Sequence, residues 1–179
     1  MRWARSKAYF FAHTPVDGMA KSFEFLIREA RGEMQAKKRD ALITSLYDAG
    51  LEPERWSDAL LKLGAAFEGL GGQFFLWDAN LRGAPFSVMA GAPPGIAERY
   101  VEYYGSIDPK LEYSLRMPAG EWLLCNEVFD QRFVSQSEFY QDFFVPSGGR
   151  YVAGTRLLDT GGQSALLGLF RPEIGRAHV

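Results

Sequence analysis

Few side chains in this 179-residue chain could do covalent chemistry: it has one cysteine, two histidines and 22 acidic residues. Nucleophilic catalysis of the Ser-His-Asp or Cys-His kind needs a histidine base, but His13 and His178 both lie close to an end of the sequence. Cys125 falls in a strand-like pattern, where a small buried hydrophobic role is the usual one. One cysteine and two histidines cannot build a Cys/His zinc site. We therefore expect no enzyme, no metal site and no cofactor.

Carboxylates and glycines give no stronger catalytic signal. Asp108 lies at a helix junction and Glu121 beside a strand pattern, and their spacing does not single out an acid–base pair. The glycine-rich positions match neither a phosphate-binding loop nor a dinucleotide fingerprint. The glycine pairs at 148–149 and 161–162 are typical of turns.

The most distinctive feature is a cluster of aromatic residues around one aspartate. Such residues either fill a core or form a pocket with aromatic walls and a few polar groups that orient a small molecule. Asp108 can cap the helix that begins at Pro109 or, if it points inward, accept a hydrogen bond from a ligand. The candidate ligand-binding residues are Tyr100, Tyr104, Asp108, Trp122, Phe139 and Phe143.

Hydrophobic periodicity predicts the elements that position these residues. Helical spacing covers 19–34, 42–50, 53–69, 94–107, a segment from 109 to 116, and 136–145. Alternating patterns predict strands over 73–78, 85–91, 121–126, 150–158 and 163–170. Because this order lacks a regular βαβ alternation, we expect an α/β (α+β) fold with an antiparallel sheet of about five strands and helices packed on it.

The strand over 121–126 suggests where a ligand would lie. Alternation places Trp122 on one face of that strand and Leu123 on the other. A stripe formed by Ile96, Tyr100, Tyr103 and Ile107 must also be buried, and the nearest sheet face is the natural place for it. We therefore expect a ligand between the sheet and the helices of 94–116, on the face of Trp122.

Charge is distributed unevenly along the chain, whose net charge is −2. Residues 1–40 hold nine basic and five acidic side chains, whereas the remainder is acidic overall. An acidic balance is not typical of a nucleic-acid-binding surface. The apolar run at 165–170 is far shorter than the ~20 residues that span a bilayer. We expect a soluble, cytoplasmic protein with no membrane partner.

Several short segments, taken in order, resemble a known family. They are Asp48–Trp56, Pro94–Ile96, Tyr100 with Tyr103-Tyr104, Asp108-Pro109, and Phe139–Phe143 with Pro146. Together they resemble the N-terminal sensor region of bacterial LuxR-type transcription regulators, in the branch with a GAF- or PAS-like domain before a helix-turn-helix. The acyl-homoserine-lactone receptors of the wider family have an aromatic helix, then Asp-Pro, then a tryptophan. Tyr100 or Tyr104, Asp108 and Trp122 stand in comparable places here.

The resemblance covers about residues 38–171 and implies a domain division. It implies a partly helical N-terminal extension at 1–37 and a GAF/PAS-like sensor domain at 38–171. The residues of the tail at 172–179 themselves resemble translated adaptor sequence. A fragment is expected, with DNA bound only through a helix-turn-helix domain missing from it. An apolar stripe formed by Phe23, Ile27, Ala30 and Met34 has no partner inside such a sensor, so we also expect a homodimer.

Two functions remain open at this point. The first is a signal-sensing regulatory domain that binds an unknown small-molecule effector and controls the DNA-binding domain. The alternative is a ligand-free dimerisation module of such a regulator, with a filled core. An apolar cavity lined by Tyr100, Asp108 and Trp122 favours the sensor, and a filled interior favours the dimerisation module.

Overall fold

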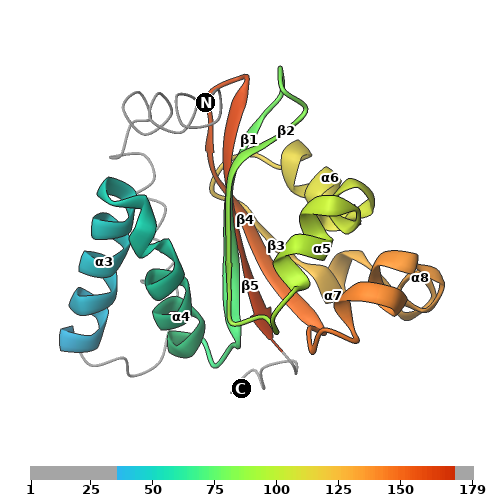
Figure 1. Ribbon diagram of the computed structural model, residues 1–179, viewed down its shortest axis with the longest axis horizontal. Coiled ribbons are helices and arrows are strands. Elements are labelled where there is room, and N and C mark those ends of the chain that lie inside the picture. The colour runs from blue at the N-terminus through green and yellow to red at the C-terminus, as the bar shows by residue number, and fades with distance from the viewer. Residues whose placement is uncertain (1–35, 172–179) are drawn as a thin grey trace.

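The computed structural model describes residues 36–171. A five-stranded antiparallel sheet in the order β2-β1-β5-β4-β3 separates two layers of helices (Figure 1). The strands are β1 (Gly71–Asp78), β2 (Gly83–Ala90), β3 (Trp122–Leu124), β4 (Tyr151–Asp159) and β5 (Gln163–Arg171). The expected α+β class and antiparallel five-stranded sheet are confirmed.

One face of the sheet is covered by α3 (Ala36–Leu51), the 3₁₀ turn η1 (Pro53–Arg55) and α4 (Trp56–Ala66). Trp56 is fully buried and stacks face to face on Phe74 of β1, with 3.7 Å between the ring centroids. Leu60 and Leu63 follow on the same side of α4 and are also fully buried. Burial of these large apolar side chains is the main force that holds this layer on the sheet.

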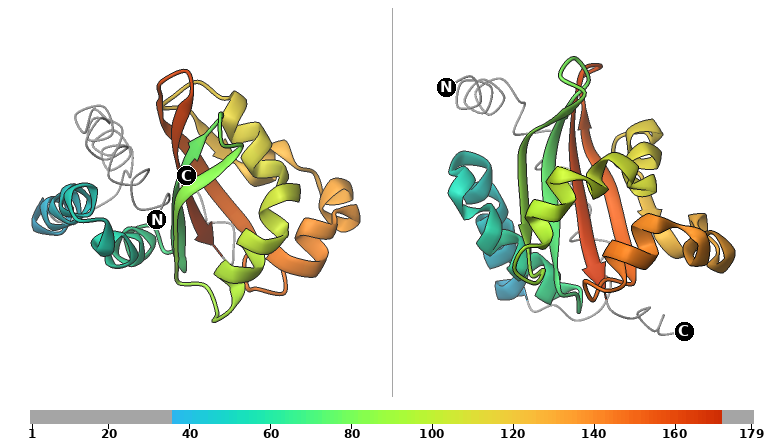
Figure 2. Two further views of the ribbon diagram at one scale, coloured as in Figure 1. Left: turned by 45° about the horizontal axis from the view of Figure 1, so that its top comes forward. Right: turned by 45° about the vertical axis from the view of Figure 1, so that its right-hand side comes forward.

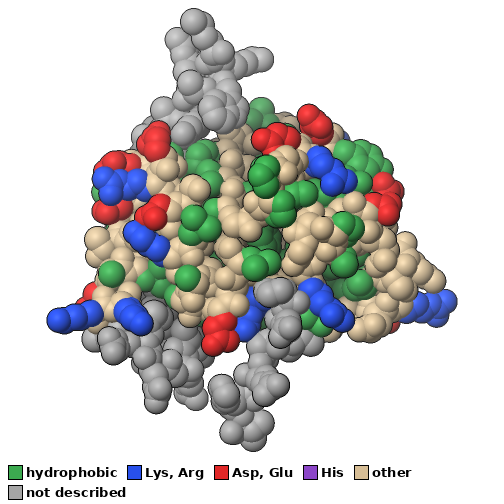
Figure 3. Space-filling model, turned by 60° about the horizontal axis from the view of Figure 1, so that its bottom comes forward, with side chains coloured by type: hydrophobic (Ala, Val, Ile, Leu, Met, Phe, Trp, Pro, Cys, Tyr) green, Lys and Arg blue, Asp and Glu red, His purple; other side chains and the backbone are tan. Residues whose placement is uncertain are grey.

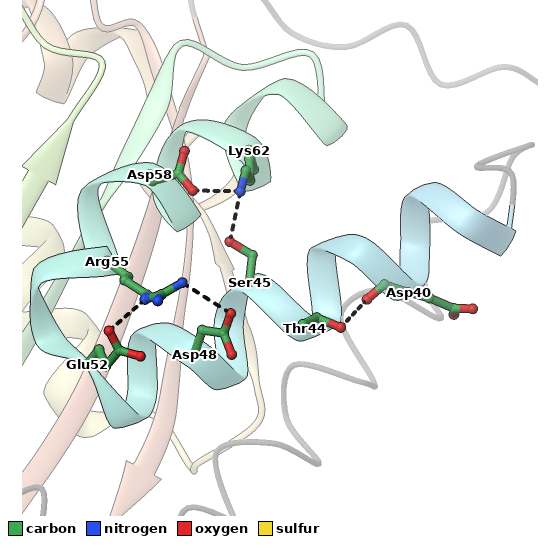
Figure 4. A network of polar contacts seen from close by, with 8 residues as sticks. All are labelled: Asp40, Thr44, Ser45, Asp48, Glu52, Arg55, Asp58 and Lys62. Atoms are coloured by element: carbon green, nitrogen blue, oxygen red, sulfur yellow. Dashed lines mark hydrogen bonds and ion pairs between the residues drawn. The ribbon is translucent and has the colours of Figure 1, made fainter.

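Polar contacts on the outer surface join α3 to α4 (Figure 4). Arg55 donates to Glu52 at 2.9 Å and lies 3.5 Å from Asp48, while Lys62 contacts both Asp58 and Ser45. The three ion pairs are solvent-exposed, so each contributes only about 0–1 kcal/mol, whereas the contact from Lys62 to Ser45 is partly buried. They orient the two helices, whereas the apolar core supplies most of the stability.

The opposite face is covered by a chain of short elements (Figure 2). They are α5 (Ile96–Glu102), the 3₁₀ turn η2 (Tyr104–Ile107), α6 (Pro109–Arg116), α7 (Cys125–Val128), α8 (Gln131–Gln136) and the π-helical turn η3 (Phe139–Phe144). A second core cluster lies beneath them and consists of Tyr100, Cys125, Phe139, Tyr140, Phe143, Phe144 and Val152. The sheet therefore has a separate apolar core on each face.

The predicted single helix over 94–107 is wrong at its end. The α-helix stops at Glu102, and η2 follows with a different backbone path. Tyr103 and Ile107 consequently remain 48% and 37% exposed, instead of joining the buried stripe. The chain folds tightly at Gly105, where a Cβ would lie only 2.9 Å from the Tyr100 carbonyl oxygen. This contact between segments is not visible in a periodicity pattern.

The predicted strand over 121–126 is wrong after Leu124. Leu124 pairs with Ala153, but Cys125 begins α7. The Val152 amide of β4 would need a hydrogen-bond acceptor on β3 if that strand continued. It donates instead to the Cys125 sulfur, at 3.0 Å. Helix α8 was not predicted, although Asp130 caps it by accepting from the Phe133 amide at 2.7 Å.

The helix predicted over 19–34, its apolar stripe and the tail at 172–179 lie outside the described residues. Within residues 36–171, no helix is both long enough and apolar enough to cross a membrane.

Candidate ligand-binding cavity

A cavity lies between the sheet and the second helical layer. Its volume is about 70 Å³, taken as the space that the centre of a water-sized sphere can occupy. One water molecule needs about 10–15 Å³ on that measure, so the cavity has room for a small organic molecule. The loops before β1 and after β2 contribute Leu70 and Gly91 to its lining. On the face turned forward in Figure 3, hydrophobic side chains gather in the centre and charged ones lie mostly toward the rim.

The floor of the cavity is a single row of residues across all five strands. Met89 of β2 is opposite Gln73, Gln73 is opposite Gly168, Gly168 is opposite Gly154, and Gly154 is opposite Leu123. All five line the cavity. Directly opposite residues in antiparallel strands point to the same face, so this row forms one continuous surface.

Two neighbouring positions of the floor, Gly168 on the central strand β5 and Gly154 on β4, have no side chain. A Cβ on Gly168 would meet nothing closer than 3.5 Å, and one on Gly154 nothing closer than 3.6 Å. Neither glycine has a positive φ. Neither the backbone conformation nor a close approach of neighbouring atoms requires glycine at these two positions. Its effect here is to leave space above the sheet. Glycine inside a strand is the signal in the sequence that could have indicated this site.

The walls of the cavity are aromatic and come mainly from η3. Phe139, Phe143 and Phe144 all line it, and their rings pack against one another, with Phe139 5.5 Å from Phe143 and 5.9 Å from Phe144. Tyr100 of α5 closes the wall beside Phe143, at 6.0 Å between centroids. A surface of this kind binds flat or aliphatic groups through shape and dispersion.

Asp108 forms the polar end of the cavity. It caps α6, because its Oδ1 accepts from the Lys110 amide at 2.9 Å. Its side chain also points inward and is buried, so the two interpretations of Asp108 are compatible in geometry. The Tyr100 hydroxyl donates to Oδ2 at 3.1 Å. Burial, reinforced by Asp108, raises the pKa of Tyr100, so this hydroxyl stays protonated and acts as the donor.

Lys110 is a buried cation in this apolar cavity, and sequence reasoning missed it. It is only 7% exposed, and its ammonium nitrogen lies 2.8 Å from Asp108 Oδ1. The same nitrogen lies 3.6 Å from the centre of the Phe139 ring and 4.7 Å from that of Phe144. Burial lowers the pKa of Lys110, and the Asp108 carboxylate opposes that effect. A lysine at the second position of a helix is usually exposed, so nothing in the local pattern indicates its burial.

Four of the six predicted ligand-binding residues line this cavity: Tyr100, Asp108, Phe139 and Phe143. Tyr104 lies outside its lining and stacks on Phe143, at 4.5 Å between ring centroids. Trp122 lies on the other face of the sheet, where it packs against the first core cluster. Its neighbour Leu123 contributes to the cavity floor instead. We expected Trp122 to lie on the sheet face that the helices of 94–116 cover, and this expectation is wrong.

Tyr140 and Cys125 form a second buried contact behind the walls. The Tyr140 hydroxyl lies beside the Cys125 thiol, and within residues 36–171 it makes no conventional hydrogen bond. Burial raises the pKa of both groups, so both remain protonated and neutral at pH 7. In the same part of the chain, no group of three or more His, Cys, Asp or Glu side chains is arranged to hold a metal ion.

Comparison with known proteins shows which solved structures have a similar fold. No protein-family model and no curated protein sequence matches the chain. Among solved structures, it is similar to CepR2 of Burkholderia cenocepacia, an N-acylhomoserine-lactone-dependent LuxR-family transcription factor. The TM-score is 0.58 and the identity 20%, over 78% of this chain and 81% of that one. It is also similar to the LBD domain of VqsR from Pseudomonas aeruginosa, with TM-score 0.56 and 13% identity over 77% and 82% of the two chains. The chain thus has the fold of the sensor regions of these regulators.

Proposed function

We propose that this chain is a signal-sensing regulatory domain that binds a small, largely apolar effector in the cavity. The effector would control a helix-turn-helix DNA-binding domain of the LuxR type. The observation that carries the proposal is the floor of the cavity, where Gly154 and Gly168 leave space that two methyl groups could occupy without a clash. Glycine in a strand interior costs stability, which is understandable where a ligand approaches the sheet.

The same observation argues against the ligand-free alternative. A dimerisation module with a filled core has no need of an apolar cavity, because each unfilled space forfeits packing energy. The fold it shares with a lactone-dependent transcription factor gives independent support for a sensor. The expected homodimer stays a prediction.

The experiment fills the cavity from its floor. In the double variant Gly154→Ala/Gly168→Ala, two methyl groups enter the space without a clash, since their nearest contacts are 3.5 Å or longer. Ethylbenzene is the probe, and its affinity for the full chain is measured by NMR titration. We expect the double variant to bind it at least tenfold more weakly and to unfold at the same or a higher urea concentration.

Gly162→Ala is the matched control, because a Cβ at that position in the β4–β5 turn meets nothing within 4 Å. It should bind ethylbenzene as the wild type does. If the double variant kept full affinity for ethylbenzene, or if the wild type did not bind it in the cavity at all, the cavity would not be the effector site.

A further inference from the structure

We propose that Lys110 determines specificity in this cavity, which selects an effector whose head group is a neutral hydrogen-bond acceptor, such as a ketone or ester carbonyl, attached to an apolar body. This inference rests on the proposed function and adds the chemical class of the effector's polar group. It follows from the unused hydrogen-bonding capacity of the polar end.

The donors and acceptors at the polar end are unequally used. An ammonium group has three N–H donors, and within residues 36–171 that of Lys110 has only one hydrogen-bond acceptor, Asp108 Oδ1. The rings of Phe139, Phe144 and Tyr140 lie 3.6, 4.7 and 5.1 Å from this nitrogen and attract its charge, but they offer no oxygen or nitrogen acceptor. Two of the three N–H donors therefore lack such an acceptor. Burying a donor without an oxygen or nitrogen acceptor is unfavourable. A ligand acceptor placed there would remove that cost.

Asp108 is the more fully engaged of the two charged groups. Its Oδ1 accepts from both the amide and the ammonium of Lys110, and its Oδ2 accepts from Tyr100. A carboxylate has about four acceptor positions, so three are already occupied. A ligand that offers N–H groups would compete with partners already in place, whereas a ligand that offers an oxygen would not.

The charge balance of the cavity further limits which chemical classes of head group it can bind. Among the residues that line the cavity, Asp108 and Lys110 are the only charged ones, and they neutralise each other. A carboxylate ligand would add an uncompensated negative charge to an apolar space, and an amine would add a positive charge beside Lys110. Each would pay a desolvation cost with no counter-ion. A neutral carbonyl avoids both costs.

The test compares three probes with the same carbon skeleton on the full chain: ethylbenzene, acetophenone and 1-phenylethylamine. Wild type and Lys110→Met are titrated by NMR. Methionine keeps an unbranched apolar stem against the aromatic walls but has no donor. We expect the ratio of acetophenone to ethylbenzene affinity to fall about 10- to 100-fold in Lys110→Met, the range of a hydrogen bond to a charged donor. Lys62→Met, on the outer surface of α4, should leave the ratio unchanged.

A measurement on the wild type alone covers the case in which Lys110→Met does not fold. The carbonyl carbon of ¹³C-labelled acetophenone should resonate, when bound, at least as far downfield as it does in water. A bound resonance upfield of that position, toward its value in hexane, would mean that no donor reaches the carbonyl and would overturn the inference.

The remaining outcomes separate the two proposals. If ethylbenzene and acetophenone bind in the cavity but Lys110→Met leaves their ratio unchanged, the assignment of Lys110 fails and the effector site stands. Tighter binding of 1-phenylethylamine than of acetophenone would make Asp108 the selecting group and overturn the inference. If none of the three binds in the cavity, the proposed function fails and this inference fails with it.

Discussion

At the residue scale, the polar end of the cavity shows how a single position can serve folding and binding together. Asp108 satisfies a free amide at the start of α6 and, with the same carboxylate, holds Tyr100 and Lys110 inside an apolar layer. Helix capping alone explains an aspartate before a proline. The inward ammonium and hydroxyl are additional features that only the packing of α5 and η3 against α6 creates.

Two buried tyrosines provide a matched test of this polar end. Tyr100→Phe removes the hydroxyl that donates to Asp108, and we expect it to lower the free energy of unfolding by about 1.5–3 kcal/mol, as for a hydrogen bond to a charged group. Tyr140→Phe removes a hydroxyl that makes no conventional hydrogen bond within residues 36–171, so stability should stay the same or rise. Urea denaturation measures both. Equal losses in the two variants would contradict the assigned hydrogen bonding.

At the element scale, α4 lies unusually close to β1. A Cβ on Gly64 would lie 2.6 Å from the Gly71 Cα, so the helix and the strand touch through their backbones. This contact sets the position of the first helical layer relative to the sheet. Sequence patterns show Gly64 only as a glycine in a helical segment, where alanine is normally preferred.

We therefore expect opposite effects from two glycine-to-alanine substitutions in helices. Gly50→Ala, near the end of α3, meets nothing within 4 Å and should stabilise the chain by up to about 1 kcal/mol. Gly64→Ala must push α4 from β1 and should destabilise it by about 1–3 kcal/mol. Thermal and urea unfolding measure the stability of the two variants. Stabilisation by Gly64→Ala would show that α4 and β1 do not approach each other closely at Gly64 and Gly71.

A second prediction at the element scale concerns the end of β1. Asp78 is buried and accepts from the Gln163 side chain at 3.0 Å and from the amides of Asn80 and Leu81. The hydrogen bond from Gln163, followed by those amides, lowers the pKa of Asp78 below its ordinary value of 3.8. Stability from this carboxylate is therefore fully present above pH 3.8 and is lost as the pH falls through its folded-state pKa.

Asp78→Asn keeps the shape but not the charge. We expect it to lower the free energy of unfolding by about 1 kcal/mol at pH 7, the typical net value of one hydrogen bond. The difference from wild type should stay constant down to about pH 5 and shrink below pH 3.8, where both side chains are neutral in the unfolded chain. Urea unfolding at several pH values measures it. A difference that grew on acidification would reverse the assigned sign.

At the scale of the whole molecule, the sheet separates two cores with different tasks. The core under α3 and α4 is closed by fully buried Trp56, Leu60 and Leu63. The other core is covered by short helices and borders the cavity, which is partly open to solvent. We interpret the first layer as the scaffold and the second as the part that responds to an effector, in line with the lower local stability expected of ligand-binding regions.

Hydrogen exchange can test this division. At ten times the dissociation constant of ethylbenzene, openings that destroy the cavity become about 1.4 kcal/mol more costly, which slows exchange roughly tenfold. We expect this protection for the amides of α5, α6 and η3. Amides of α3 and α4 that exchange by local opening should be unaffected, and the Gly154→Ala/Gly168→Ala variant should lose the protection. Uniform slowing across both layers would contradict the division.

The sequence by itself determined those features that depend on neighbouring residues. The strands β1, β2, β4 and β5, the absence of βαβ alternation and the start of α6 at Asp108-Pro109 all follow from short-range periodicity and from the backbone chemistry of proline and aspartate. The density of aromatic residues in η3 is also visible in the sequence, and it predicts Phe139 and Phe143 as residues of a binding site.

Only the tertiary structure decided which residues share a face. Alternation separated Trp122 from Leu123 correctly, but it could not tell which of the two faces the helices of 94–116 would cover. The floor of the cavity joins positions as distant as Gln73 and Gly168, which meet only through strand pairing. Lys110 is buried because α6, η3 and the sheet close around it, and the energy that offsets its desolvation comes from Asp108 and from the ring of Phe139. Register between strands and contact between layers are long-range properties, and no local pattern specifies them.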